Sequence, residues 1–217
     1  MAISQRNPVR APGGRGRAER GVQGNERLTG VTGMLLIAIL AVIGVSILRI
    51  RQLIDVHLFV GMMLLAPLAL KLASTGWRFA GYYLGRPAYR GKGPPITPLR
   101  ILAAPVVLLT ALVMASGLVM LFGGPSTRST WLAIHKLSFI AWLMVTAVHV
   151  LAHLRESLRS TELELLPPAA GRPRPVSGRG ARLMLIATML ALGVIIALIA
   201  MPDFAPWAHQ VAVVVDH

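Results

Sequence analysis

The chain has 217 residues, of which 55% are hydrophobic and only 14% are charged, with a formal net charge of +14. Its apolar residues come in long blocks with the charges gathered between them, which excludes an ordinary soluble globular protein and gives no indication of nucleic-acid binding. Cysteine is absent, which excludes disulfides, iron–sulfur clusters and thiol catalysis for this chain.

Residues 1–27 carry six arginines among Gly, Pro, Asn and Gln, and predict a disordered, basic cytoplasmic tail. The apolar blocks that follow are each near the roughly 20 residues that cross about 30 Å of hydrocarbon. We therefore predict an all-α integral membrane domain over residues 28–201. Its five transmembrane helices span residues 28–48, 53–74, 99–122, 131–154 and 182–201. A flexible linker is expected over 160–181, and a short outer tail over 202–217.

The basic residues predict the orientation of these helices. Arginine and lysine are concentrated before the first helix, between the second and third helices, and between the fourth and fifth helices. The other connections hold few basic residues, and the segment after Met201 holds none. Because cytoplasmic loops carry an excess of basic residues, the N-terminus is predicted in the cytoplasm and the C-terminus outside, in the plasma membrane.

Ionisable residues inside the predicted helices are the candidates for function, because a polar side chain in hydrocarbon is costly. The second helix contains His57 and Lys71. The fourth contains His135, Lys136, His149 and His153. His57 and His135 each lie a few residues into a helix that runs inward from the outer face, so we expect the two rings at similar depth.

Lys71 and His149 each follow fourteen residues after these histidines, nearly four helical turns further along the same helix face. If the faces of the second and fourth helices meet, His57 lies opposite His135 and Lys71 lies opposite His149. Two imidazoles at one level are the ligands of a six-coordinate b-type haem. Small residues are expected beside a porphyrin, and Gly61, Ser116 and Gly117 would leave room for it between the helices.

The stretches "DVHLFVGMMLL", "LTALVMASGLVMLF" and "LAIHKLSFIAWLMVTAVHVLAH" resemble the bacterial membrane b-type cytochromes over roughly residues 28–155. That group includes the cytochrome b subunits of formate dehydrogenases and hydrogenases, and the ferric-reductase transmembrane domain. The resemblance implies a bundle that carries electrons between a quinone or cytoplasmic donor and a partner site. It implies haem ligation by His57, His135 and His149.

The chain departs from those families at two places. Lys71 stands where the ferric-reductase pattern has a second histidine, and the first helix lacks the histidine of the dehydrogenase subunits. The resemblance therefore completes one ligand pair, which predicts one haem b and leaves a second, inner haem as an alternative.

Each candidate also has an alternative interpretation. For His57 and His135, the alternative is a pair of interfacial histidines bonded to backbone or water, with no cofactor. Lys71 would extend toward the cytoplasmic headgroups, pair with a haem propionate or an anionic substrate, or ligate iron. His149 and His153, one turn apart, would hold an inner haem or a small metal ion, or form a proton-handling pair.

The sequence predicts a membrane electron-transfer protein that holds haem b and serves a redox partner protein or quinone. It carries no nucleotide-binding motif of its own, so an independent enzyme is not expected. The alternative is a cofactor-free membrane scaffold or assembly subunit.

The loop "WRFAGYYLGRPAYRGKGPP" is expected to contact anionic lipid or to dock a soluble partner.

Overall fold

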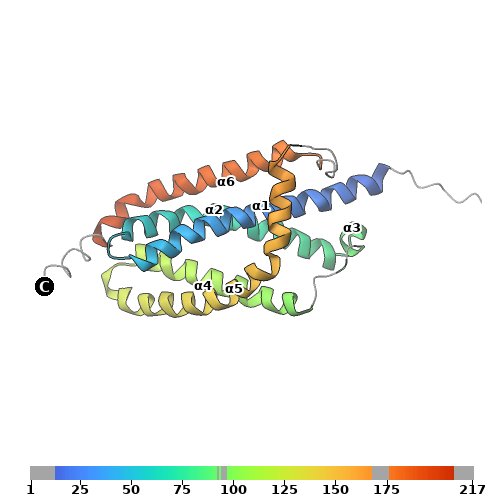
Figure 1. The fold of residues 1–217 in the computed structure, drawn as a ribbon. Coiled ribbons are helices and arrows are strands. Elements are labelled where there is room, and N and C mark those ends of the chain that lie inside the picture. Colours follow the sequence, from blue (N-terminus) through green and yellow to red (C-terminus); the bar gives the residue numbers. More distant parts are fainter. Residues whose placement is uncertain (1–12, 92, 94–96, 168–175, 208–217) are drawn as a thin grey trace, which may run out of the picture.

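The computed structural model describes residues 13–91, 93, 97–167 and 176–207, and these residues form a helical bundle with no strand among them (Figure 1). Five helices in this part of the chain are long and apolar enough to cross a membrane, which confirms an all-α, multi-pass membrane protein. The helices are α1 (Gly13–Leu48), α2 (Ile54–Tyr83), α3 (Pro87–Arg90), α4 (Thr97–Phe122), α5 (Arg128–Leu165) and α6 (Arg179–Ala200), with the 3₁₀ turns η1 (Pro125–Thr127) and η2 (Met201–Phe204).

The outward faces of the long helices carry large apolar side chains, as expected where lipid replaces water. On α5, Leu137, Met144 and Leu151 recur every seven residues, and each is about 70% exposed. A soluble protein would bury such a stripe, because contiguous exposed apolar surface of this extent promotes association. The stripe is therefore the lipid-facing side of α5.

Figure 1 shows how the five long helices are arranged. α6 lies along α2, α2 lies along α1, and α4 lies along α5 on the other side of the bundle. The last part of α5 turns across α1 and reaches the start of α6. We call the end with the α1–α2 and α4–α5 connections the outer end, after the predicted orientation, and the opposite end the inner end.

α6 packs on α2 where a proline has freed a backbone carbonyl. Pro67 has no N–H to donate to the carbonyl of Met63 four residues earlier, and its side chain is fully buried. Gly193 of α6 lies directly against that carbonyl, so that a Cβ at this position would overlap Met63 O and touch Pro67 Cδ. The glycine lets the two backbones meet at this point.

The disordered tail predicted over residues 1–27 is wrong for its second half. α1 already begins at Gly13, and residues 1–12 lie outside the described part of the chain. The extension is held by polar contacts: Asn25 Nδ2 donates to the carbonyl of Ser74 (2.9 Å), and Thr29 Oγ1 donates to the hydroxyl of Ser74 (3.0 Å). Apolar content alone therefore understates how far this helix extends.

The predicted linker over 160–181 is also too long, because α5 continues to Leu165 and α6 starts at Arg179. Two contacts explain the continuation. Gly30 of α1 brings its backbone so close to Ser160 that an added Cβ would lie 2.5 Å from Ser160 Cβ. Buried Glu164 accepts two hydrogen bonds from Arg182 of α6, at 2.7 and 3.0 Å.

The predicted outer tail over 202–217 is packed in its first part. η2 covers Met201–Phe204, and Phe204 is buried in an apolar cluster with Met62 and Leu121. Trp207 packs against the same cluster, and residues 208–217 lie outside the described part of the chain. Two large aromatic side chains so close to the end of α6 find apolar surface to bury, which holds this segment on the bundle.

The basic aromatic loop after the second predicted helix is partly helical. α2 runs on to Tyr83, Gly85 reverses the chain with φ of 76°, and α3 follows. The Tyr89 ring packs on Gly81, and the Arg86 guanidinium lies 4.4 Å above the Trp77 ring. The loop is thus folded back on the inner end of α2.

Candidate functional site

A long apolar cavity of about 460 Å³ runs through the bundle between α1, α2, α4 and α5. Its size falls in the range of about 300–1,000 Å³ that is typical of cofactor pockets. His57, Gly61, Gly117 and His135 line it toward the outer end, and Lys71, His149 and His153 line it toward the inner end. All seven residues that the sequence singled out therefore face one cavity.

His57 of α2 and His135 of α5 meet across the outer half of this cavity. Their ring centroids lie 6.5 Å apart, with the ring planes at 89°. Metal–imidazole bonds are about 2 Å long and a ring is about 2 Å across, so rings that share a metal have centroids roughly 6 Å apart. The perpendicular planes are compatible with this, because each ring is free to rotate about its own metal bond.

The two helices meet differently from the direct packing that the sequence analysis assumed. α2 packs against α1 and α6, while α5 packs against α4 and α1, so the described parts of α2 and α5 face each other across the cavity. The imidazoles therefore approach from opposite walls. This wider separation leaves space between the helices for a flat group.

A serine holds each imidazole by its Nδ1 atom. Ser46 Oγ donates its hydrogen to the carbonyl of Ile43 (2.6 Å), so it accepts the Nδ1–H of His57 at 3.1 Å. On the other wall, His135 Nδ1 lies 3.1 Å from the carbonyl of Val113 and 3.0 Å from the hydroxyl of Ser116.

A carbonyl only accepts hydrogen bonds, so His135 carries its proton on Nδ1, as His57 does. In both rings the lone pair therefore lies on Nε2. Each hydrogen bond that these rings make within the described chain uses Nδ1. Fixing one ring nitrogen as a donor and leaving the other as a ligand is the usual arrangement around metal-binding histidines.

The two glycines contribute space in different ways. A Cβ at Gly117 would lie 3.4 Å from Cε1 of His135, so this glycine lets the imidazole lie close against α4. A Cβ at Gly61 would meet nothing within 4 Å, so this glycine opens the cavity wall one turn below His57. Larger residues would fill the space beside each ring.

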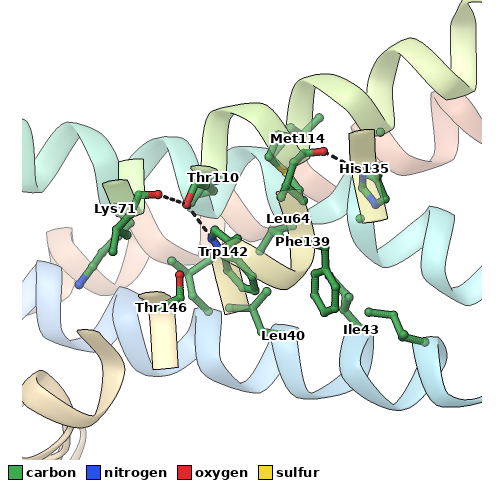
Figure 2. Close-up of a pocket in the computed structure, with 18 of the residues that line it drawn as sticks. Leu40, Ile43, Leu64, Lys71, Thr110, Met114, His135, Phe139, Trp142 and Thr146 are labelled. Atoms are coloured by element: carbon green, nitrogen blue, oxygen red, sulfur yellow. Dashed lines mark hydrogen bonds between the residues drawn. The ribbon is translucent and has the colours of Figure 1, made fainter. Parts of the chain in front are cut away.

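Trp142 lies halfway along α5 between His135 and His149, and joins α5 to α4. Its indole N–H donates to Thr110 Oγ1 at 2.9 Å, and Thr110 donates in turn to the carbonyl of Val106 at 2.6 Å (Figure 2). The bond fixes a large ring between the outer and inner halves of the cavity.

The inner half does not repeat the outer arrangement. Lys71 Nζ donates to the carbonyl of Thr29 in α1 at 2.7 Å, and Figure 2 shows its side chain turned toward α1. The remaining inner imidazoles, His149 and His153, are neighbours on one helix with ring centroids 4.8 Å apart. Across the cavity from His149, the described chain offers no second imidazole.

The inner histidines are arranged as a short polar row along α5. His153 Nδ1 lies 4.0 Å from a carboxylate oxygen of Glu156, which is well exposed, whereas His149 Nδ1 is buried without a hydrogen-bond partner among the described residues. Among the described residues, no group of three or more His, Cys, Asp or Glu side chains is placed to hold a metal ion. The row thus differs from the paired, serine-held imidazoles of the outer half.

Ser46 is the site residue that sequence reasoning missed. The first predicted helix has no ionisable residue, so nothing in it pointed to the cavity. A serine in an apolar helix ordinarily bonds its own backbone, as Ser46 also does with Ile43. Only the packing of α1 on α2 reveals its second contact, with His57.

The outer half of the cavity fits a haem by the chemistry of its residues. It offers two imidazoles that each keep a free Nε2 lone pair, a fixed Nδ1–H on each ring, a glycine beside each wall, and a lining that is mostly apolar but includes Lys136. These are the features that a bis-histidine haem site needs.

The chain was compared with models of protein families, with curated proteins and with solved structures. None of these three comparisons finds a match.

Proposed function

We propose that this protein is a membrane electron-transfer protein that holds one haem b between His57 and His135. The observation that carries the proposal is the pair of opposed imidazoles, 6.5 Å apart, each held by a buried serine through Nδ1. A cofactor-free scaffold would have no need for two histidines with free Nε2 atoms facing an apolar cavity. When bound, haem would accept and release one electron at a time.

The residues of the chain would tune and shield this carrier. Ser46 and Ser116 orient the rings and make them stronger electron donors through the Nδ1–H bonds. The apolar walls exclude water from the site, which favours the less charged, ferrous state. The chain would pass electrons between a redox partner protein or quinone and an acceptor, in the plasma membrane.

One haem is proposed, because the inner half of the cavity lacks an opposed pair. Lys71 donates to Thr29 O, and no imidazole lies across from His149 in the described chain. A lysine would also need to lose its proton before it coordinated iron. The inner histidines are better suited to handling protons, since such rows inside a membrane mark proton pathways.

The proposal is tested by purifying the protein in detergent, adding haem and recording the reduced-minus-oxidised absorption spectrum with the haem-to-protein ratio. We expect b-type bands and a ratio near one. His57→Ala and His135→Ala should each abolish the bands of the low-spin haem, whereas His153→Ala, a matched change at the inner end, should retain them.

Three results would contradict the proposal. A well-folded, colourless protein would favour the scaffold instead. Bands that survive in both His57→Ala and His135→Ala would remove the proposed ligands. A ratio near two, with one haem lost in His149→Ala, would add an inner haem and make the single-site assignment wrong.

A further inference from the structure

Two buried donors at the outer mouth of the cavity have no acceptor in the described chain. Trp207, just after η2, lines the cavity, and the guanidinium carbon of Arg128 lies 4.0 Å above the Trp207 ring. Arg128 Nε and Trp207 Nε1 are both buried without a hydrogen-bond partner. Because an unmet buried N–H costs free energy, the pair indicates an acceptor that the described chain does not supply.

The charges around this mouth favour an anionic acceptor. The sequence has no Asp or Glu between Asp55 and Glu156. Asp203 of η2 is exposed, and Arg128 forms no ion pair with it or with any other described carboxylate. Lys136, next to His135, adds a second cation to the cavity lining. A guanidinium with further N–H donors suits a carboxylate, whose two oxygens accept several hydrogen bonds at once.

The position of these residues connects them to the haem site. Arg128 begins α5, and Lys136 and His135 follow about two turns later on the same helix. Trp207 is held in place by its packing beside Phe204. Trp207 and Lys136 line the same cavity as His57 and His135, and Arg128 lies against the Trp207 ring.

We propose that Arg128, Trp207 and Lys136 form a carboxylate site at the outer mouth, and that this site takes the propionate groups of the haem. The inference rests on the proposed function. Haem is apolar except for two carboxylates on one edge, so these residues would hold that edge at the mouth and leave the apolar edge to the cavity walls. They act as positioning residues, since His57 and His135 would bind the iron.

Two porphyrins test this site directly: haem, and haem dimethyl ester, in which both propionates are esterified and uncharged. The affinity of each for the detergent-purified protein would be measured by absorbance titration. We expect the native protein to prefer haem by about tenfold or more, the effect of losing one charge-assisted hydrogen bond. Arg128→Gln should reduce that preference to near one, while the ester binds with unchanged affinity.

Two further variants separate the site from general charge and folding effects. Trp207→Phe keeps an aromatic ring for packing but removes the N–H, and should lower the preference in part. Arg51→Gln makes the same charge change in the α1–α2 connection, away from the cavity lining, and should leave the preference intact.

The outcomes distinguish this inference from the haem proposal itself. If neither porphyrin binds, the proposed function fails. If both bind the native protein equally, or if Arg128→Gln retains the preference for haem, the carboxylate site is wrong although the haem remains. Equal binding together with quenching of tryptophan fluorescence by acetate, absent in Trp207→Phe, would assign the site to a free carboxylate and overturn the propionate assignment.

Discussion

At the scale of single residues, the serines behind the imidazoles make the most specific prediction. Ser46 accepts the Nδ1–H of His57, and Ser116 shares the Nδ1–H of His135 with the carbonyl of Val113. These bonds increase the electron donation of each ring to a bound iron. Ser46→Ala and Ser116→Ala should therefore destabilise the ferric state and raise the reduction potential. One hydrogen bond is worth about 0.5–1.5 kcal/mol, which corresponds to roughly 20–60 mV for one electron.

A potentiometric titration of the haem-loaded protein measures this shift, and Ser138→Ala is the matched control. Ser138 is also buried and donates to the carbonyl of His135 three residues earlier, but it makes no hydrogen bond with an imidazole ring of the described chain. The reduction potential of Ser138→Ala should stay near that of the native protein. A fall in potential in Ser46→Ala, or an equal change in all three variants, would show that the serines do not act through Nδ1.

At the scale of helices, the bundle depends on close backbone contacts, of which Gly193 against Met63 O is the tightest. Gly193→Ala places a methyl group where the α2 carbonyl lies, so α6 must move away from α2. Overpacking of this kind costs about 1–3 kcal/mol. We expect a lower apparent unfolding temperature in detergent.

Gly44→Ala is the control for this substitution. A Cβ at Gly44 meets nothing within 4 Å, so the change adds only helix propensity, which favours alanine over glycine by about 0.5–1 kcal/mol. The two variants should therefore shift the unfolding temperature in opposite directions. If Gly193→Ala is as stable as the native protein, α6 does not pack on α2 through this contact.

Helix boundaries show where sequence patterns are informative. Hydropathy located all five spanning helices, because twenty or so apolar residues leave few alternatives. It missed the polar ends of α1 and α5, which are stabilised by specific contacts of Asn25 with Ser74 and of Glu164 with Arg182. Such contacts join residues far apart in the sequence, and no periodicity reveals them.

At the scale of the whole molecule, the site too is predictable where it depends on helical spacing, and not where it depends on packing between helices. The depth of His57 and His135 follows from their positions in two helices of the same direction, and the rings do meet. Lys71 and His149 also line the same end of the cavity, as the same arithmetic predicts, but the Lys71 amine donates to the Thr29 carbonyl of α1. Helical spacing indicates which residues share a face, whereas the neighbour across that face depends on packing.

The central claim is that the rings of residues 57 and 135 share one iron, and electron paramagnetic resonance of the oxidised, haem-loaded protein tests it most directly. Two imidazole ligands make ferric haem six-coordinate and low-spin, so the account predicts a low-spin signal that becomes high-spin in His57→Ala and in His135→Ala. A high-spin signal in the native protein, or a low-spin signal that persists in both variants, would contradict it.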